Sequence, residues 1–249
     1  MRTPSPVANT PWGQPPDIVA FTGAGLSRES GFAPFDAGAM PAGLRLEDVV
    51  TQEGFAGDPA RVLDFYNLRR RQLLEAKPNA AHDGLAVLDA VRKREMLIVT
   101  RNIDDFHERA GSRAVVHTHG ELLKARCMIC TRVSERYDDI TAASDCPICG
   151  NKGHLRPHVV WVGEEPLGIA RVYEALAQCR LFLAIGVVGG SEPARSFLAA
   201  ARRAGARTIE FPGASSRDPA PLPEPFDECI PGVLAETVSD YVKRLFSAS

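Results

Sequence analysis

The stretch DIVAFTGAG, residues 17–25, decides the fold of this chain. A short apolar run stops at two glycines, and this pattern predicts a buried strand followed by a tight turn. Backbone N–H groups in such a turn can face a pyrophosphate, so Gly23, Ala24 and Gly25 are candidate phosphate contacts. The turn is weak evidence by itself, because its spacing departs from the G-x-G-x-x-G dinucleotide fingerprint.

Strand and helix patterns alternate along the rest of the chain. The strand patterns lie at residues 95–100, 158–163, 181–188 and 207–211. The helix patterns lie at 59–76, 81–94, 169–178, 193–205 and 233–246, and a short helix at 106–110 is closed by Gly111. Such alternation predicts an α/β fold, in which a mostly parallel, Rossmann-like sheet carries helices on both faces.

Length and composition fit one large domain with a small insert. The chain has 249 residues, of which 45% are hydrophobic, and a net charge of −2. This balance argues against a general nucleic-acid or membrane partner, and no apolar run approaches the roughly 18 residues that span a bilayer. Residues 1–16 lack the apolar segment of a secretory signal and have the composition of a flexible tail. We therefore expect a cytoplasmic protein.

Four of the six cysteines form two C-x-x-C pairs, Cys127 with Cys130 and Cys146 with Cys149. In a chain without a signal peptide, such pairs indicate a metal rather than disulfides. Two knuckles complete a tetrahedral Zn²⁺ site without an open position, so the zinc is expected to be structural. Four unrelated thiols, or a zinc ribbon that binds nucleic acid, are the alternatives. Nearby acids offset the basic residues that such a ribbon would use.

The cysteine pairs mark residues 124–154 as a small inserted zinc-binding module. This segment is rich in turn residues and has little apolar periodicity. The Rossmann-like domain is accordingly expected over 17–123 and 155–249. Part of the segment 36–75 is expected to pack beside the module.

Polar residues follow the predicted strand at 95–100. Asn102 and Asp104 would lie at the carboxyl edge of the sheet, where ligands of open α/β sheets bind. The alternative is that Asn102 is a turn residue and Asp104 an N-cap. His119 lies next to Gly120, which lets the backbone pass close by.

Several motifs follow one another over residues 17–205: GAG-x-S-x-x-SG, T-x-N-I-D-x-x-H-x-x-AG, HG-x-L, the two C-x-x-C pairs, RPHVVW-x-GE and G-x-x-x-x-x-x-PA. This order resembles the sirtuins, the NAD-dependent protein lysine deacylases, and most of all the bacterial CobB type within class III. The resemblance implies that NAD and an acyl-lysine peptide meet in a cleft between the Rossmann-like domain and the zinc module.

The resemblance also implies a reaction. Nicotinamide leaves the ribose as the acyl oxygen of the substrate attacks, which forms an alkylimidate. His119 is then the general base that activates a ribose hydroxyl, a task that suits a neutral imidazole. Water finally releases free lysine and O-acyl-ADP-ribose.

The family's functional positions match particular residues of this chain. His119, Asn102 and Asp104 match the catalytic positions. The cofactor positions are Gly23, Ala24, Gly25, Ser27, Phe35, Arg101, Asn102, Ile103, Asp104, Gly186, Val187 and Val188. The substrate positions are Tyr66, Arg69, Val159, Val160 and Trp161.

Tyr66 and Arg69 match the Y-x-x-R pair of class III enzymes. Positions i and i+3 of a helix share a face, so a phenol and a guanidinium can converge on one anion. The carboxylate of a succinyl- or malonyl-lysine would suit bidentate capture by arginine. The alternative is a solvated basic helix face, since residues 69–71 are all arginine.

The chain departs from the family pattern on the cofactor side. Asp36 stands where the family has arginine, and Arg101 where it has glutamine. Residues 186–188 read GVV in place of glycine-threonine-serine, Pro212 replaces an asparagine, and the loop after residue 36 is shortened to AGAMPAGL. A rebuilt NAD site, a different ADP-ribose-type ligand, NAD glycohydrolysis and an inactive binding scaffold are therefore all open.

The exchanged charges at residues 36 and 101 lead to a hypothesis. Arg101 either pairs with Asp36 or takes over an anion contact in the NAD cleft, and its charge lowers the pKa of His119. The alternative is that Asp36 points to solvent and Arg101 merely lines the cleft.

Overall fold

The computed structural model of the chain describes residues 16–32, 40, 43–92, 95–187, 192–213 and 225–247. Phe35, Asp36, Val188 and the predicted tail up to residue 15 lie outside these ranges. Its strands are β1 Ile18–Thr22, β2 Met96–Thr100, β3 Val115–His117, β4 Gly120–Cys127, β5 Val133–Glu135, β6 Leu155–Val159, β7 Leu181–Ile185, β8 Arg207–Phe211 and β9 Glu228–Cys229. Its helices are α1 Ala24–Arg28, the 3-10 turn η1 Leu46–Asp48, α2 Gln52–Gly57, α3 Pro59–Glu75, α4 Ala80–Val91, α5 Phe106–Ala110, α6 Ile169–Leu176, α7 Ala194–Arg203 and α8 Leu234–Ser247.

Six strands form one parallel sheet in the order β3-β2-β1-β7-β8-β9. At its centre Ile18 of β1 lies between Met96 of β2 and Leu181 of β7. The chain winds outward from β1 in one direction and from β7 in the other. The strand order therefore reverses between these two strands, which is where open α/β sheets bind ligands.

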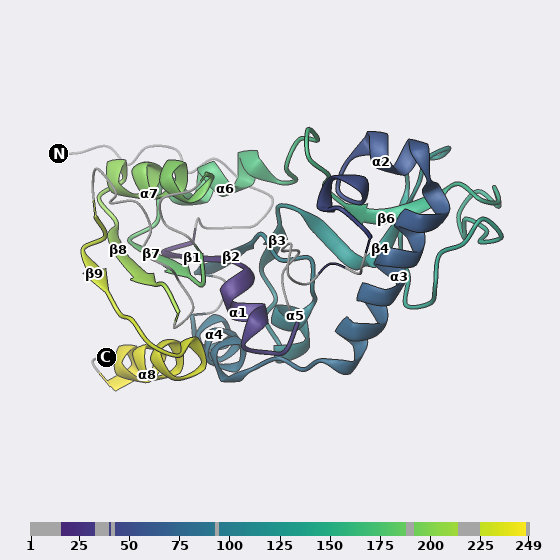
Figure 1. Cartoon of the computed structure of the whole chain (residues 1–249). Coiled ribbons are helices and arrows are strands. Elements are labelled where there is room, and N and C mark those ends of the chain that lie inside the picture. Colours follow the sequence, from purple (N-terminus) through teal and green to yellow (C-terminus); the bar gives the residue numbers. More distant parts are fainter. Residues whose placement is uncertain are drawn as a thin grey trace.

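Helices cover both faces of this sheet (Figure 1). Because successive side chains of a strand point to opposite faces, β1 contributes to two cores. Val19 and Phe21 pack with α6 and α7, whereas Ile18 and Ala20 pack with α4 and α8. All five residues of β1 are buried, as expected for a parallel strand that is covered on both sides.

A second, antiparallel sheet has the order β5-β4-β6 and packs against helix α3 (Figure 1). Pro59 at the first position and Asp58 as N-cap begin α3, as helix-start statistics favour. The hydrophobic core between α3 and this sheet also contains two of the four paired cysteines, Cys127 and Cys146. Helix α3 and the cysteine module therefore form one packed body. Among the described residues, no helix is long and apolar enough to cross a bilayer.

Polar contacts reinforce the attachment of α3 to this body. The Asn67 amide donates to the Ile140 carbonyl at 2.9 Å and accepts from the Ile140 N–H at 2.8 Å. The fully buried Arg70 donates to Asn67 Oδ1 at 2.7 Å and to the Leu122 carbonyl at 3.3 Å. Since α3 carries Tyr66 and Arg69, these two residues are held to the small sheet by both apolar and polar contacts.

The predicted parallel sheet with helices on both faces is confirmed. The strand predicted at 158–163 is misplaced, since β6 ends at Val159. After Val159 the backbone N–H groups of Val160 and Val162 donate to His119 O and Val50 O, so the chain leaves the sheet. The domain division at 124 and 154 stays a prediction, and the small sheet itself begins at Gly120.

Candidate functional site

The parallel sheet with its helices forms one body of the molecule, and α3 with the antiparallel sheet and the cysteine module forms a second, small body. A cavity of about 170 Å³ opens where these two bodies meet. The carboxyl ends of β1 and β2 contribute Ala24, Ser27, Arg101, Asn102, Ile103 and Asp104. The small body contributes Tyr66, Arg69, Val159 and Val160, and His119 lies between β3 and β4. Phe32 and Val50 complete the wall. Most of the residues predicted for the cofactor, the substrate and catalysis are therefore brought together in one place.

Three polar side chains form a buried network on the sheet side of the cavity. Ser27 Oγ donates to Asp104 Oδ2 at 2.6 Å. Asn102 Nδ2 donates to Ser27 Oγ at 2.8 Å and to the Gly23 carbonyl at 3.0 Å. Burial raises the pKa of Asp104 to about 6, although hydrogen bonds from Ser27 and the Phe106 N–H oppose this shift. The network joins the glycine turn to the polar residues that follow β2.

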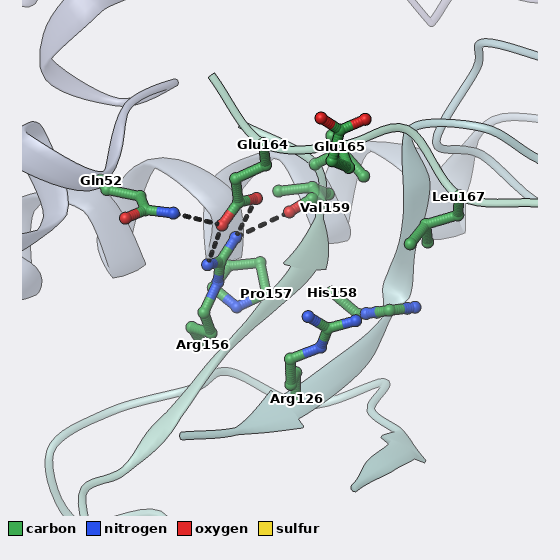
Figure 2. Close-up of a pocket in the computed structure, with 10 residues that line it drawn as sticks. Gln52, Arg126, Arg156, Pro157, His158, Val159, Glu164, Glu165 and Leu167 are labelled. Atoms are coloured by element: carbon green, nitrogen blue, oxygen red, sulfur yellow. Dashed lines mark hydrogen bonds and ion pairs between the residues drawn. The ribbon is translucent and has the colours of Figure 1, made fainter. Parts of the chain in front are cut away.

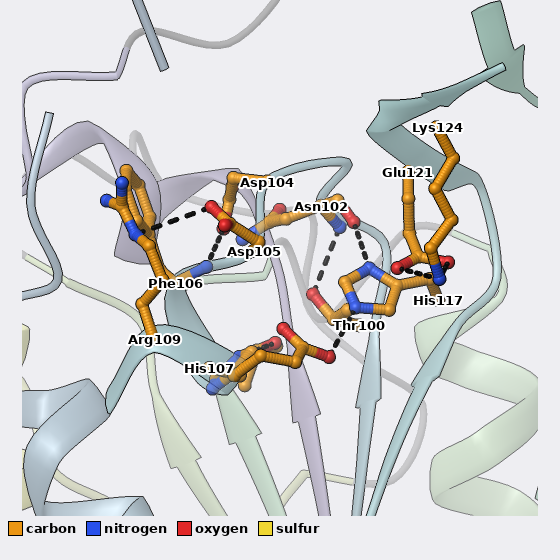
Figure 3. A network of polar contacts seen from close by, with 12 residues as sticks. Thr100, Asn102, Asp104, Asp105, Phe106, His107, Arg109, His117, Glu121 and Lys124 are labelled. Atoms are coloured by element: carbon orange, nitrogen blue, oxygen red, sulfur yellow. Dashed lines mark hydrogen bonds and ion pairs between the residues drawn. The ribbon is translucent and has the colours of Figure 1, made fainter. Parts of the chain in front are cut away.

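A second polar network holds the loop that follows β2 and carries Asn102 (Figure 3). His117 bonds the Asn102 carbonyl at 3.1 Å through Nδ1 and Glu108 Oε1 at 2.9 Å through Nε2. Burial alone would lower the pKa of His117, but the Glu108 carboxylate raises it above its ordinary value. His117 thus supports the loop that carries Asn102 and does not line the cavity.

His119 has a different environment from His117. Its Nδ1 lies 2.9 Å from Thr118 Oγ1. Burial, and then the positive charge of Arg101, lowers the pKa of His119 to about 4. The imidazole is therefore neutral at physiological pH. Burial also lowers the pKa of Arg101, and no carboxylate in the described ranges pairs with it.

The glycine turn packs directly on the end of β7. The Gly23 N–H donates to Ile185 O and the Gly25 N–H to Gly186 O, both at 3.0 Å. The N–H groups of these two glycines therefore bond the last residue of β7 and the residue after it, and the phosphate contact expected of this turn stays a prediction. Val187 is 5% exposed and belongs to the core, so its side chain offers no polar contact to a ligand.

On the small-body side, α3 presents Tyr66 and Arg69 to the cavity. The Arg69 guanidinium lies over the Phe32 ring at 4.2 Å and donates to Gln72 Oε1 at 2.8 Å. Tyr66 Oη accepts a hydrogen bond from Trp161 Nε1 at 3.0 Å. Trp161 is 3% exposed, so it supports Tyr66 from within the core instead of facing the cavity.

A second cavity, of about 400 Å³, shares Val159 and Val160 with the first (Figure 2). Arg156 donates to the two Glu164 carboxylate oxygens at 2.7 and 3.0 Å, and its guanidinium stacks 3.5 Å from the Trp161 ring. Burial alone would raise the pKa of Glu164, but hydrogen bonds from Arg156 and Trp161 lower it to about 2. This ion pair fixes the segment that follows β6.

The four paired cysteines converge on one point, and Cys127 and Cys146 are buried there. Their sulfur atoms all lie within 4.8 Å of one another, and Cys127–Cys149 and Cys130–Cys146 are each separated by 3.8 Å. A tetrahedron with Zn–S bonds of about 2.3 Å has S···S edges of about 3.8 Å. Backbone and amide N–H groups also point at Cys127 and Cys149. The cluster could therefore hold one Zn²⁺ with four thiolates.

Some site residues were not predicted, and some predicted residues cannot be placed. Thr118, Phe32 and Val50 belong to the site but were missed. A hydroxyl next to a candidate base was the available signal for Thr118, and an aromatic residue after the glycine turn was the signal for Phe32. Phe35, Asp36 and Val188 lie outside the described residues.

These features define a Rossmann-like α/β protein with an inserted four-cysteine module and, between the two, a cavity lined by both apolar and polar side chains. The Sir2 family profile matches residues 23–193. The chain belongs to the Sir2 family, the sirtuins.

Similar proteins agree with this assignment. The chain is 41% identical over 235 residues to the NAD-dependent protein deacylase of Yersinia pseudotuberculosis serotype I (strain IP32953), covering 93% of this chain and 83% of the relative. It is 43% identical over 233 residues to the NAD-dependent protein deacylase of Escherichia coli (strain K12), covering 92% and 82%.

Two solved structures share the fold. A Sir2 homologue in complex with NAD superposes with a TM-score of 0.81 at 32% identity, covering 93% of this chain and 90% of the other. A Sir2 protein bound to an acetylated peptide has a TM-score of 0.73 at 23% identity, covering 93% and 92%. The second likeness concerns the fold alone.

Proposed function

We propose that this chain is an NAD-dependent protein lysine deacylase that releases nicotinamide and O-acyl-ADP-ribose. One observation carries the proposal: the neutral His119 and the Ser27–Asn102–Asp104 network line one cavity in a chain that matches deacylases over more than nine-tenths of its length. His119 takes a proton from a ribose hydroxyl of the bound NAD, because its neutral ring is available as a base. Asn102 and Asp104 hold the nicotinamide end of the co-substrate.

The test is product analysis by mass spectrometry. The purified protein is incubated with NAD and with acetyl-, succinyl- and malonyl-lysine peptides. Nicotinamide, deacylated peptide and O-acyl-ADP-ribose should accumulate together, and His119→Ala should abolish peptide deacylation. Nicotinamide release without peptide would point to a glycohydrolase, and tight binding without turnover would point to a scaffold. Either result would overturn the proposal.

The acyl group that we propose is a dicarboxylic one, succinyl or malonyl, in preference to acetyl. Tyr66 and Arg69 are one helical turn apart and line the same cavity. Stacking on Phe32 and the bond to Gln72 hold the Arg69 guanidinium in a fixed place. A carboxylate at the end of the acyl chain would gain a charge-assisted hydrogen bond there, which an acetyl group cannot make.

Arg101 is our candidate for a rebuilt anion contact in the NAD cleft. It lines the cavity, it is partly buried, and burial lowers its pKa without opposition from a nearby carboxylate. A desolvated cation of this kind favours a bound anion. The Gly186–Val187 turn offers no hydroxyl to the co-substrate, so the phosphates need a donor from elsewhere.

Calorimetry of NAD binding tests this contact and its link to Asp36. We expect Arg101→Gln to weaken NAD binding, Asp36→Arg to weaken it through like-charge repulsion, and the double variant to restore it. Additive effects of the two substitutions would show that the residues are not coupled.

A further inference from the structure

The hydroxyl of Thr118 contacts a backbone carbonyl on one side and the ring of His119 on the other. Thr118 Oγ1 lies 3.0 Å from the Thr100 carbonyl oxygen and 2.9 Å from His119 Nδ1. Thr118 is 1% exposed, so water does not compete for either contact. The Thr118 N–H also donates to Thr100 O, at 2.9 Å, which fixes the backbone that carries the hydroxyl.

These contacts determine where the protons lie. A carbonyl oxygen can only accept, so the hydroxyl must donate its single proton to Thr100 O if that contact is a hydrogen bond. The hydroxyl oxygen then accepts, and His119 Nδ1 has to carry the proton that it receives. The reverse arrangement would set two oxygen lone pairs 3.0 Å apart in a buried place. One tautomer of the ring therefore satisfies both contacts.

We propose that Thr118 is a positioning residue that holds His119 in its Nδ1–H tautomer and leaves Nε2 as the proton acceptor in the cavity. The proposal rests on the proposed function, in which His119 is the base. Three hydrogen-bonded groups fix the tautomer: the Thr100 carbonyl, the Thr118 hydroxyl and the His119 imidazole. The residue that hydrogen-bonds one ring nitrogen decides the role of the other.

The neutral state of His119 makes the tautomer matter. Because burial and Arg101 keep the ring uncharged, only one nitrogen carries a proton. An imidazole without a partner in water favours the Nε2–H tautomer, in which Nε2 cannot accept a proton. Loss of the Thr118 hydroxyl would therefore change His119 Nε2 from a proton acceptor into a proton donor without moving the ring.

The experiment compares Thr118→Val, which has the same shape and no hydroxyl, with Thr118→Ser, which keeps the hydroxyl. Thr237→Val is the matched control, because the Thr237 hydroxyl of helix α8 donates to the carbonyl of Val233, just before the helix, far from the cavity residues. Two-bond ¹H–¹⁵N correlation spectra of histidine-labelled protein report the tautomer of His119 without substrate. Steady-state kinetics with NAD and an acylated peptide report turnover.

We expect the Nδ1–H tautomer in the wild type, in Thr118→Ser and in Thr237→Val, and a shift toward the Nε2–H tautomer in Thr118→Val. We expect kcat to fall by at least about tenfold in Thr118→Val and by no more than the roughly 10²–10⁴-fold that a general base contributes as a whole. KM for the peptide should stay unchanged, and Thr118→Ser should restore most of kcat.

An unchanged Nδ1–H tautomer in Thr118→Val would overturn the proposal, as would full kcat with a changed tautomer. If Thr118→Val does not fold, Thr118→Ala is measured in the same way, with the same two outcomes. A wild-type protein without deacylase activity would overturn the proposed function. The spectra would still decide the tautomer in that case.

Discussion

The substitution Gly25→Ala tests how closely the glycine turn is built against the sheet. A methyl group on Gly25 would lie 2.9 Å from both the Cα and the carbonyl oxygen of Gly186. Carbon atoms in contact prefer separations of about 3.5–4.0 Å. Both atoms belong to the backbone, so relief requires that the turn or the end of β7 moves by more than half an ångström, by this estimate.

The magnitude follows from three contributions. Forcing an extra methyl group into a packed site costs about 1–3 kcal/mol. Moving the turn weakens the Gly25 N–H bond to Gly186 O, worth about 0.5–1.5 kcal/mol. The lower entropy of the unfolded chain returns about 0.4–1 kcal/mol. The protein should lose about 0.5–4 kcal/mol, which lowers the unfolding temperature of a chain of this size by about 1–16 °C.

Thermal unfolding of Gly25→Ala and of the control Gly57→Ala measures the effect. Gly57 is the last residue of α2, it is exposed, and a methyl group there meets nothing within 4 Å. Gly57→Ala should therefore be neutral or stabilise the protein by about 0.4–1 kcal/mol. Equal unfolding temperatures for the two variants would refute the close packing of the turn. Because Ser27 lies on the same short helix, Gly25→Ala should also weaken NAD binding.

Three further changes have defined outcomes. Cys146→Ser should lower the metal content below about one Zn²⁺ per chain and lower the unfolding temperature, since a four-thiolate site loses a ligand; full metal content by elemental analysis would contradict the zinc assignment. Arg69→Met should reduce kcat/KM for a succinylated peptide far more than for an acetylated one, because a charge-assisted pair worth about 1.5–3 kcal/mol is lost; equal losses would exclude a carboxylate contact. Burial lowers the pKa of His82 in the folded protein to about 4, whereas in the unfolded chain it is about 6.5. As the pH falls from about 6.5 to 4, the unfolded chain therefore binds a proton at His82 that the folded protein does not bind, and the protein loses stability. Urea unfolding at pH 7.5 and 5 should show a loss about 2 kcal/mol smaller in His82→Gln than in the wild type, and equal losses would exclude this role.

Local sequence signals predicted the elements of the parallel sheet well. β1, β2 and β7 are short apolar runs that end at glycine or polar residues, and these strands and β8 are observed within the predicted ranges. The prediction failed at β6, where an apolar run continues beyond the strand. Val160 and Val162 are apolar like their neighbours, but their N–H groups pair with the loops at His119 and Val50. Such long-range pairing leaves no mark in the local pattern.

Site residues could be predicted where the residue type and its spacing allow few other roles. The cysteine spacing led to the four-sulfur cluster, and the polar residues after β2 led to Asn102 and Asp104. Thr118 was missed because a threonine beside a histidine is common and its role depends on where the Thr100 carbonyl lies. The use of the Gly23 and Gly25 N–H groups was likewise set by the partner strand, which the turn sequence does not reveal.

The two bodies of the molecule each supply part of the cavity wall, so the residues with different proposed roles lie on different bodies. Helix α3 holds Tyr66 and Arg69 to the cysteine module, whereas Ser27 in α1 and Asn102 and Asp104 in the loop after β2 lie at the edge of the parallel sheet. Under the acyl selectivity proposed for Tyr66 and Arg69, substitutions in α3 would change the preferred acyl group without disturbing the residues that move the proton. A chimera that exchanges residues 43–76 together with 120–159 should transplant the choice of acyl group as one inherited unit.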